Sequence, residues 1–362
     1  MSVIQNNLLM TPEGYQISRS VRLRSSASAY FNRTFSTPTN QNVWSLSLWV
    51  KRGALSVNQS ILAMGSLGAI WLNSSNQIVF YNNAGSAAAT STAVYRDPSA
   101  WGHLCVINNG TTTKAYWNSV EVLSWTQTGW NINTAGAHYL GRNSTANTYL
   151  DGYLTEVNFI DGQALTPSSF GETDSLTGVW KPKKYAGAYG TNGFYLNFSD
   201  NSAATAAAIG KDSSGNGNNW TPNNISVTAG VTYDSMLDVP TPYADGGNGR
   251  GNYAVLNPLA TQSTATTLTN GNLTVTQTAS GNAAYFATVQ SSNNAYYFET
   301  TVTSLNGDAY IGVADFASSA TAVYQANSVY RADGTIYNGS GWSAYGASFT
   351  TGDVIGVAYD LT

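Results

Sequence analysis

Short runs of alternating apolar and polar residues, separated by turns of glycine, asparagine and serine, dominate this chain of 362 residues. In the clearest run, WSLSLWVKR at residues 44–52, one side of a strand carries Trp44, Leu46, Leu48 and Val50, and the other carries Ser45, Ser47, Trp49 and Lys51. AIWLN and QIVFYN follow as a pair joined by SSNQ, and HLCVINN and TKAYWNSVEVLSW as a pair joined by NGTT. Short strands at steady spacing favour antiparallel pairing. We therefore predict an all-β protein built on an antiparallel sandwich.

Changes in composition along the sequence divide the chain into four parts. Residues 1–17 form an N-terminal arm with a few apolar residues, and residues 18–170 carry the first set of strands. Residues 171–252 are a Gly/Asn/Pro-rich connecting region with at least one added strand, GFYLNF. The stretch DSMLDVPTPYADGGNGRGN at its end is the best candidate for a domain boundary. Residues 253–362 form a second β region that contains NAYYFETTV, AYIGVADF and GDVIGVAYDL.

The scarcity of charge restricts the partners of this chain. Charged residues make up 9% of it, against about 25% in average soluble proteins, and the net charge is −4 with no Lys/Arg block. Nucleic acid and acidic membranes need basic patches, so we expect neither as a partner. The N-terminus lacks the pattern of a secretory signal, and no run of about 18 apolar residues predicts a membrane helix. Cys105 is the only cysteine, which excludes an intrachain disulfide.

Three carboxylates, Asp151, Glu156 and Asp161, lie close together in the stretch YLDGYLTEVNFIDGQAL at residues 149–165. A glycosidase needs two carboxyl groups about 5–5.5 Å or about 6.5–9.5 Å apart. In a continuous strand Glu156 and Asp161 face opposite sides of the sheet, and Asp161–Gly162 is typical of a turn. We therefore expect Glu156 to accept hydrogen bonds at the rim of the sheet, and we predict a protein that is not an enzyme.

Other catalytic and metal-binding arrangements find little support in the sequence. His103 and His138 are the only histidines, and both lie in strand-like segments, so we expect them to be sandwich residues. Cys105 lies in an apolar strand, where a thiol is inert. Two histidines and one cysteine do not supply a tetrahedral zinc site. The oxygen-rich stretch DSSGNGNN (212–219) lacks the spacing of a calcium loop and is explained by a turn, so no cofactor is predicted and calcium stays an open alternative.

Tryptophan in polar surroundings gives the one indication of a ligand site. WTQTGWNINTAG places Trp125 and Trp130 in a turn-rich segment, in a chain of 10 tryptophans and 23 tyrosines. Such rings stack on sugar rings, while Asn and Asp hydrogen-bond to hydroxyl groups. The alternative is that both tryptophans close one end of the sandwich. We name Trp125 and Trp130 as candidate ligand-binding residues and leave the two interpretations open.

Blocks between residues 18 and 170 resemble, in order, the laminin-G-like, concanavalin A-like jelly roll. They are SVRLRSSASAYFNRT, WSLSLWVKRG, WGHLCV, KAYWNSVEV, HYLGR and YLDGYLTEVNFIDGQALTP. The aromatic–asparagine hairpin of that family is matched by Tyr116, Trp117 and Asn118, although Ser119 replaces the usual glycine. Its closing strand is matched by Asp151, Gly152, Glu156 and Val157. The resemblance implies an antiparallel jelly-roll sandwich, a fold in which Asp, Asn and backbone carbonyls often hold calcium.

The last part of the chain resembles a SPRY domain, which is another β-sandwich. The matching blocks are YYFETTV, IGVAD, VYRADGTIYNG and GDVIGVAYDL. The family continues with a further hairpin and strands after the last of these blocks. The resemblance therefore implies an incomplete SPRY-like sandwich over residues 253–362, and we expect the polypeptide to run on past Thr362, since a truncated sheet exposes an edge that soluble proteins avoid.

The order of the parts resembles the tail fibres and other virion surface proteins of tailed bacteriophages. The blocks that carry this resemblance are NNLL with YQISRSVRLRSSASAY, and the linker TGVWKPKKYAGAYGTNGFYLNF, KDSSGNGNNWTPNNISVTAG and DSMLDVPTPY. It implies a structural virion protein, assembled in the host cytoplasm, that binds host surface glycan or protein as a homotrimer. Residues 1–17 would attach it to other virion proteins of the tail or capsid. The alternative is a capsid decoration protein (a head fibre) that binds no receptor.

Overall fold

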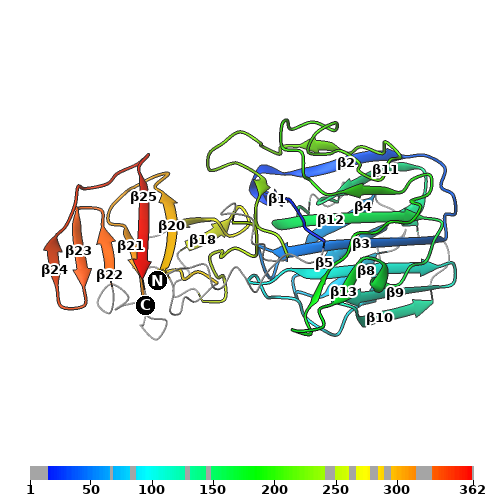
Figure 1. Cartoon of the computed structure of the whole chain (residues 1–362), viewed down its shortest axis with the longest axis horizontal. Helices are drawn as coiled ribbons and strands as arrows, with labels where there is room; N and C mark the ends of the chain where they lie inside the picture. Colours follow the sequence, from blue (N-terminus) through cyan, green and yellow to red (C-terminus); the bar gives the residue numbers. More distant parts are fainter. Residues whose placement is uncertain are drawn as a thin grey trace. The chain divides into compact units, whose positions relative to one another are not determined.

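The structure is a computed structural model, and it describes residues 15–65, 68–81, 87–126, 131–143, 148–240, 249–260, 266–277, 284–288, 295–314 and 328–360 (Figure 1). The chain divides into two compact units. Unit 1 consists of Met1–Val255 with Leu268–Thr274, and unit 2 of Leu256–Thr267 with Val275–Thr362. The predicted connecting region thus belongs to unit 1, which holds every described residue of the 171–252 segment. Residues 1–14 of the predicted arm lie outside the described residues.

One sheet of unit 1 has eight strands in the order β10-β9-β8-β3-β12-β1-β17, with β15 also paired to β12. Its strands pair antiparallel throughout the described residues. The strands are β1 (Ser20–Leu23), β3 (Val43–Arg52), β8 (Gly102–Asn109), β9 (Thr112–Trp117), β10 (Val120–Thr126), β12 (Gly152–Asp161), β15 (Phe194–Leu196) and β17 (Ser235–Met236). Figure 1 shows β12, β3, β8, β9 and β10 running side by side.

The second sheet of unit 1 has seven strands in the order β16-β2-β11-β4-β5-β6-β7. They are β2 (Tyr30–Phe35), β4 (Gln59–Met64), β5 (Gly68–Leu72), β6 (Ile78–Tyr81), β7 (Ala87–Thr90), β11 (Gly136–Leu140) and β16 (Thr221–Asn223). Short 3-10 helices are η1 (Ser25–Ala27), η2 (Asn131–Asn133) and η3 (Pro167–Ser169). The prediction of an all-β fold with antiparallel sheets is confirmed, including the predicted pairs β5–β6 and β8–β9.

The main core contains apolar side chains of both large sheets. The face of β3 predicted from the alternation of WSLSLWVKR is confirmed, because Trp44, Leu46, Leu48 and Val50 all belong to this core. The facing sheet contributes side chains that include Phe31, Phe35, Leu62, Ile70 and Phe80. Each of these residues is almost completely removed from solvent. Period-two alternation therefore fixed which side of β3 faces the sandwich interior.

The opposite face of the eight-stranded sheet is also buried, which its sequence does not require. Ser47, Trp49 and Lys51 of β3 are at most 3% exposed. Two further apolar clusters cover this face: one joins Cys105 and Ile160 to residues of the 165–195 segment, and one joins Trp49 and Tyr153 to Trp101, Trp180, Met236 and Val255. The segment after residue 165 therefore forms a third layer over part of the sandwich, and it includes the small sheet of β13 (Gly171–Thr173) and β14 (Trp180–Pro182).

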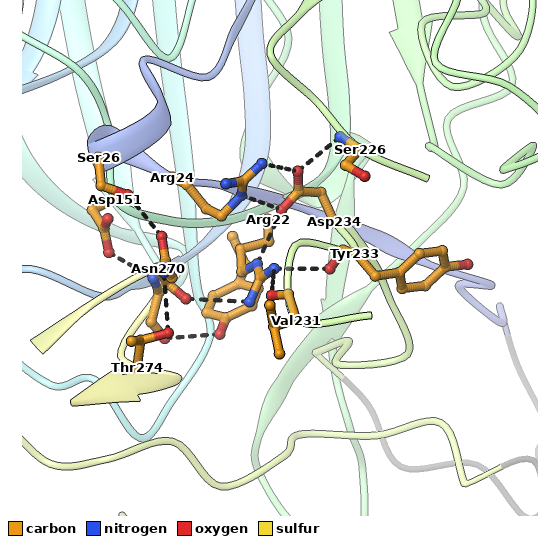
Figure 2. Close-up of polar contacts among 12 residues, drawn as sticks. Arg22, Arg24, Ser26, Asp151, Ser226, Val231, Tyr233, Asp234, Asn270 and Thr274 are labelled. Atoms are coloured by element: carbon orange, nitrogen blue, oxygen red, sulfur yellow. Dashed lines mark hydrogen bonds and ion pairs between the residues drawn. The ribbon is translucent and has the colours of Figure 1, made fainter. Parts of the chain in front are cut away.

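A buried ion cluster fastens residues 226–235 to β1. Arg22 Nε lies 3.1 Å and Arg24 Nε 2.8 Å from the same carboxylate oxygen of Asp234, and Arg24 Nη2 donates to the other oxygen at 3.0 Å (Figure 2). Ser226 N donates to that second oxygen as well, at 2.9 Å. Arg22 Nη2 donates to the carbonyls of Val231 and Tyr233. These bonds join segments that are about 210 residues apart in the chain.

Unit 2 consists of small sheets over a modest core. β20 (Ala295–Thr301) pairs with β25 (Val354–Asp360), and a four-stranded sheet has the order β21 (Tyr310–Val313), β22 (Ser328–Arg331), β23 (Thr335–Asn338) and β24 (Trp342–Ala344). The hairpin of β18 (Thr266–Thr269) and β19 (Thr274–Gln277) precedes them in the chain, and its residues are divided between the two units. The core is centred on Val302, Ala332 and Phe349. The resemblance to SPRY domains stays a prediction.

No helix among the described residues is long and apolar enough to cross a membrane.

Candidate functional site

The three carboxylates of the 149–165 stretch do not converge in the structure. Asp151 precedes β12, Glu156 lies in its middle and Asp161 is its last residue. Five residues of strand span about 16 Å, which is well beyond the separation of a glycosidase pair. The turn predicted at Asp161–Gly162 begins only at Gly162, whose φ is +93°. The face assignment for a continuous strand does not apply, because a β-bulge interrupts β12 between Thr155 and Asn158.

Asp151 and Asp161 each bind donors that belong to the fold. One oxygen of Asp151 accepts from Gly271 N at 2.7 Å, and the other accepts from the backbone and hydroxyl of Ser25. Asp161 accepts from three backbone N–H groups and from one side-chain amide, those of Thr39, Asn40, Asn192 and Asn133. Both side chains are 1% exposed. Carboxylates in such surroundings organise loops and are not directed at a substrate.

Glu156 sits at the bulge in an unusual environment. Its φ is +52°, in the left-handed region that a residue other than glycine seldom adopts. The side chain is buried, and its Oε1 accepts a hydrogen bond of 2.8 Å from the hydroxyl of Tyr195, which also bonds to Tyr15. Burial raises the pKa of the Glu156 carboxyl to about 7, while the Tyr195 bond acts in the opposite direction. Glu156 therefore accepts a hydrogen bond as predicted, but it does so in the middle of β12, between paired strands, and not at the rim of the sheet.

We expect Glu156 to make the protein less stable as the pH rises from about 4.5 to about 7. Its pKa is higher in the folded chain than in the unfolded chain, so the folded state binds more protons in this window and loses stability as they dissociate. The loss amounts to about 3 kcal/mol. Glu156→Gln keeps an acceptor for Tyr195 and cannot ionise, so urea unfolding at pH 5 and pH 8 should show a flatter pH dependence. Tyr195→Phe should shift the titration to higher pH, and parallel profiles for wild type and Glu156→Gln would contradict the prediction.

His103 and Ser47 lie as close together as the base and nucleophile of a hydrolase. The ring nitrogen that faces Ser47 carries a proton, however, and cannot accept the proton of the serine. His103 Nε2 lies 2.8 Å from Ser47 Oγ, and Trp180 Nε1 donates to His103 Nδ1 at 3.0 Å. Because Nδ1 accepts from Trp180, Nε2 carries the ring proton and donates it to Ser47. Burial also lowers the pKa of the imidazole to about 3. His103 is therefore a packed sandwich residue, as predicted, that orients Trp180.

The remaining candidates for chemistry are also satisfied within the fold. Burial lowers the pKa of His138 to about 4, so its neutral ring donates to one of the two carbonyls, those of Gly136 and Ile132, that lie 2.9 and 2.8 Å from its nitrogens. Cys105 is buried, and burial raises the pKa of its thiol. In the 212–219 loop the carboxylate of Asp212 accepts from the backbones of Tyr195, Ser214 and Asn218 and from the Ser214 hydroxyl. Among the described residues no group of three His, Cys, Asp or Glu side chains is placed to hold a metal ion.

The structure gives only part of the environment of the two tryptophans named from the sequence. Trp125 lies on β10 with its ring centroid 4.7 Å from that of Phe80, and it packs against the main core. This contact resembles the alternative in which the ring closes one end of the sandwich. Trp130 lies outside the described residues. Their role in ligand binding stays a prediction.

A different group of tryptophans lines a pocket in unit 1. The cavity has a volume of about 470 Å³ and is lined by Trp49, Ala100, Trp101, Asn118, Gly178, Val179, Trp180, Pro240 and Asn252. Trp49 and Trp101 are 3% and 7% exposed and form its buried wall, whereas Asn118, Val179 and Asn252 are exposed. Small-ligand pockets have volumes of about 300–1,000 Å³, with aromatic walls and a few polar groups. This cavity therefore has the size and the lining of a ligand site.

Several elements bring the pocket residues together. Trp49 projects from β3 on the side opposite the main core, and Trp101 immediately precedes β8, the neighbouring strand. Trp180 begins β14 and lies beside His103, with ring centroids 5.9 Å apart. Asn118 occupies the β9–β10 turn with φ +47°, which asparagine tolerates better than most residues. Its Oδ1 accepts from His103 N at 2.8 Å.

A buried ion pair supports the pocket from behind. Lys51 Nζ donates to Asp238 Oδ2, to Asn252 Oδ1 and to the carbonyl of Tyr253, at 2.8, 2.8 and 2.5 Å. Asp238 Oδ1 accepts from Trp101 Nε1 at 2.8 Å. Burial lowers the pKa of the Lys51 ammonium and raises that of the Asp238 carboxyl, and the ion pair offsets part of both shifts. Asp238 thus holds the indole of Trp101, and Lys51 holds the side chain of Asn252.

Sequence reasoning missed this pocket. Its only signal was Trp49, an aromatic residue on the side of β3 opposite the core face. Trp101 and Trp180 are 52 and 131 residues further along the chain. Nothing in their local sequence shows that β14 folds over the outer face of the eight-stranded sheet.

Similarity to known structures is confined to the fold. A proposed carbohydrate binding protein from Bacteroides ovatus is 14% identical, with a TM-score of 0.43, over 58% of this chain and 59% of its own. A heptameric SAP-like pentraxin from Limulus polyphemus is 13% identical, with a TM-score of 0.34, over 41% of this chain and 78% of its own. Domain 4 of an extracellular arabinanase from Geobacillus stearothermophilus, in complex with arabinotriose, is 22% identical, with a TM-score of 0.31, over 37% of this chain and 65% of its own.

The chain thus spans less than two thirds of the length of the Bacteroides ovatus protein. Comparison with curated proteins gives no match. A family model does match part of unit 1, from the 3-10 helix η1 to η3, and this range contains most strands of both large sheets. Residues 25–169 match a family model described as the concanavalin A-like lectin/glucanases superfamily, and this part of the chain has the antiparallel β-sandwich described above.

Proposed function

We propose that this protein binds carbohydrate without hydrolysing it, and that the tryptophan pocket of unit 1 is the binding site. The observation that carries the proposal is the convergence of Trp49, Trp101 and Trp180 with two asparagine amides around one cavity of about 470 Å³. The match of residues 25–169 to a lectin and glucanase superfamily supports a saccharide as ligand. The separation of the three carboxylates on β12 supports the absence of hydrolysis.

The pocket combines the two kinds of contact that sugar recognition needs. The apolar C–H faces of a sugar ring pack on aromatic rings, and its hydroxyl groups pair with amide donors and acceptors. The indole N–H groups of Trp101 and Trp180 are bonded to Asp238 and His103, which fixes the orientation of both rings. Rings that are fixed before binding lose little conformational entropy when a ligand stacks on them.

We expect Trp180→Ala to weaken glycan binding about tenfold, because stacking on this partly buried ring contributes about 1.4 kcal/mol. Titration of the purified protein with the best ligand from a glycan array measures the change. Trp342→Ala removes an exposed tryptophan of unit 2 and serves as the matched control, with unchanged affinity expected. Equal affinity of wild type and Trp180→Ala would exclude this pocket as the site. Steady release of reducing sugar that Glu156→Gln abolishes would contradict a non-enzymatic role.

We further propose that this protein is a tail-fibre-type adhesin of a tailed bacteriophage, which binds host surface glycan or protein. Its support is the resemblance of the opening and linker blocks to phage virion proteins, together with a weakly charged polar surface. The protein would be located in the virion after assembly in the host cytoplasm. Competition of purified protein with phage adsorption tests the receptor role, and imaging of labelled protein on particles tests the location.

Capsid decoration is the second candidate. Unit 2 exposes several large apolar side chains, among them Tyr297, Tyr345 and Val354, which are 64%, 69% and 56% exposed. Exposed apolar groups favour contacts with other proteins. A decoration protein would label the capsid and leave phage adsorption unaffected by competition, whereas an adhesin would label the tail and inhibit adsorption.

We also propose a homotrimer that is attached to the particle near its N-terminus. Several linked sites raise the apparent affinity of a weak sugar contact by about 10²–10⁴. Mass measurement in solution should give three chains. Deletion of residues 1–14 should leave the fold intact and prevent incorporation into particles, whereas a deletion reaching Ile17 would also remove a side chain that is 1% exposed. A stable monomer would exclude the trimer, and full incorporation of the deleted form would exclude the anchor.

A further inference from the structure

The lining of the tryptophan pocket is uncharged. None of the nine described residues that form it is Asp, Glu, Lys, Arg or His. A pocket for an acidic sugar needs a cation to pair with the carboxylate, because burial of an unpaired charge is costly. We propose that this pocket takes an uncharged saccharide, an inference that rests on the proposed function and specifies its ligand class.

Two lysines beside the pocket lining, Lys51 and Lys181, are already paired within the chain. Lys51 has three ammonium protons, and its three acceptors are Asp238, Asn252 and the Tyr253 carbonyl, so no donor is left for a ligand. Lys51 and Asp238 are 0% and 3% exposed. Lys181, which follows Trp180 in the chain, lies 3.1 Å from Asp174 and 3.5 Å from Glu172. Each cation named here is neutralised by this chain itself.

The amides at the rim supply what neutral hydroxyl groups need. Asn118 uses its Oδ1 to accept from His103 N and its backbone N–H to donate to His103 O, and its side-chain Nδ2 has no partner among the described residues. Asn252 uses its Oδ1 for Lys51 and one N–H for Ser99 O, which leaves a second N–H. Neutral amide donors pair with hydroxyl oxygens without a cost of charge desolvation. The pocket therefore combines stacking surfaces with neutral hydrogen-bond donors.

The test is an array of neutral oligosaccharides together with their sialylated and uronic-acid-containing counterparts. We expect binding to neutral members, with dissociation constants that change less than twofold between about 50 and 500 mM NaCl, since salt screens charge pairs and not stacking. Preferential binding of acidic members, lost at high salt and in Trp180→Ala, would overturn the inference and leave the proposed function standing. Binding of no member, or binding unaffected by Trp180→Ala, would overturn both.

Two substitutions of Asn118, at the rim, sharpen the result. Asn118→Asp keeps the acceptor for His103 N and tolerates the left-handed turn, while Asn118→Gly keeps the turn and removes both the amide donor and that acceptor. For a neutral ligand both should weaken binding by a similar factor of about three to ten, independent of salt. A loss in Asn118→Asp that is far larger and is relieved by salt would indicate an acidic ligand. Val179→Glu should also weaken binding. Because Val179 is exposed, this variant should lose less folding stability than Trp180→Ala.

Discussion

Replacement of Asp234 by alanine is expected to destabilise unit 1 by about 3–5 kcal/mol, because it leaves Arg22 and Arg24 buried without their counter-charge. Arg22 and Arg24 are 3% and 9% exposed, and Asp234 is 0% exposed. As Figure 2 shows, both arginines point at this one carboxylate. The backbone N–H of Ser226 also loses its acceptor. A loss of this size is a large part of the total stability of an ordinary domain.

Urea unfolding followed by tryptophan fluorescence measures this effect, since every tryptophan except Trp342 lies in unit 1. The matched control is Glu121→Gln, which removes the exposed pair of Lys114 and Glu121, whose side chains are both 42% exposed. Exposed pairs contribute little, so the unfolding midpoint should stay unchanged. A change below about 1 kcal/mol in Asp234→Ala would show that the cluster relaxes or hydrates at little cost.

Asp161→Ala is expected to cost about 3 kcal/mol, because three backbone N–H groups, among them that of the buried Asn192, lose their acceptor together. The bonds from Thr39 N, Asn40 N and Asn192 N are 2.7, 3.2 and 3.0 Å long. The Nδ2 donor of Asn133 contributes a fourth bond of 2.8 Å. This carboxylate joins three segments, at residues 39–40, 133 and 192, to the end of β12, so its loss should loosen all of them.

Asp161→Asn distinguishes this structural role from a catalytic one. Its single amide oxygen retains part of the acceptor set, so the loss of stability should be intermediate between wild type and Asp161→Ala. Thermal unfolding and glycan binding are measured on the same samples. A variant that is fully stable but loses a hydrolytic activity of the wild type would contradict the structural role and restore the glycosidase hypothesis.

Period-two alternation predicted the faces of β3 because side chains of a strand alternate strictly between its two sides. It placed Trp44 and Leu46 in the main core, and turn residues at SSNQ and NGTT gave the β5–β6 and β8–β9 pairs. Strict alternation is interrupted in β12, where Leu154 and Val157 both belong to the main core, because a bulge between Thr155 and Asn158 adds a residue. A bulge depends on the partner strands of β12, so the local sequence did not reveal it.

The sequence by itself determined the all-β class and the interior face of β3, and its spacing keeps Asp151, Glu156 and Asp161 apart along one strand, because these features depend on the alternation and spacing of nearby residues. Only the tertiary structure decided that Trp49, Trp101 and Trp180 meet, since β3–β8 pairing and the third layer bring them together. It also decided that Asp234 neutralises Arg22 and Arg24. Contacts between residues 50 to 200 positions apart follow from how sheets and covering segments pack, and no local pattern encodes that packing.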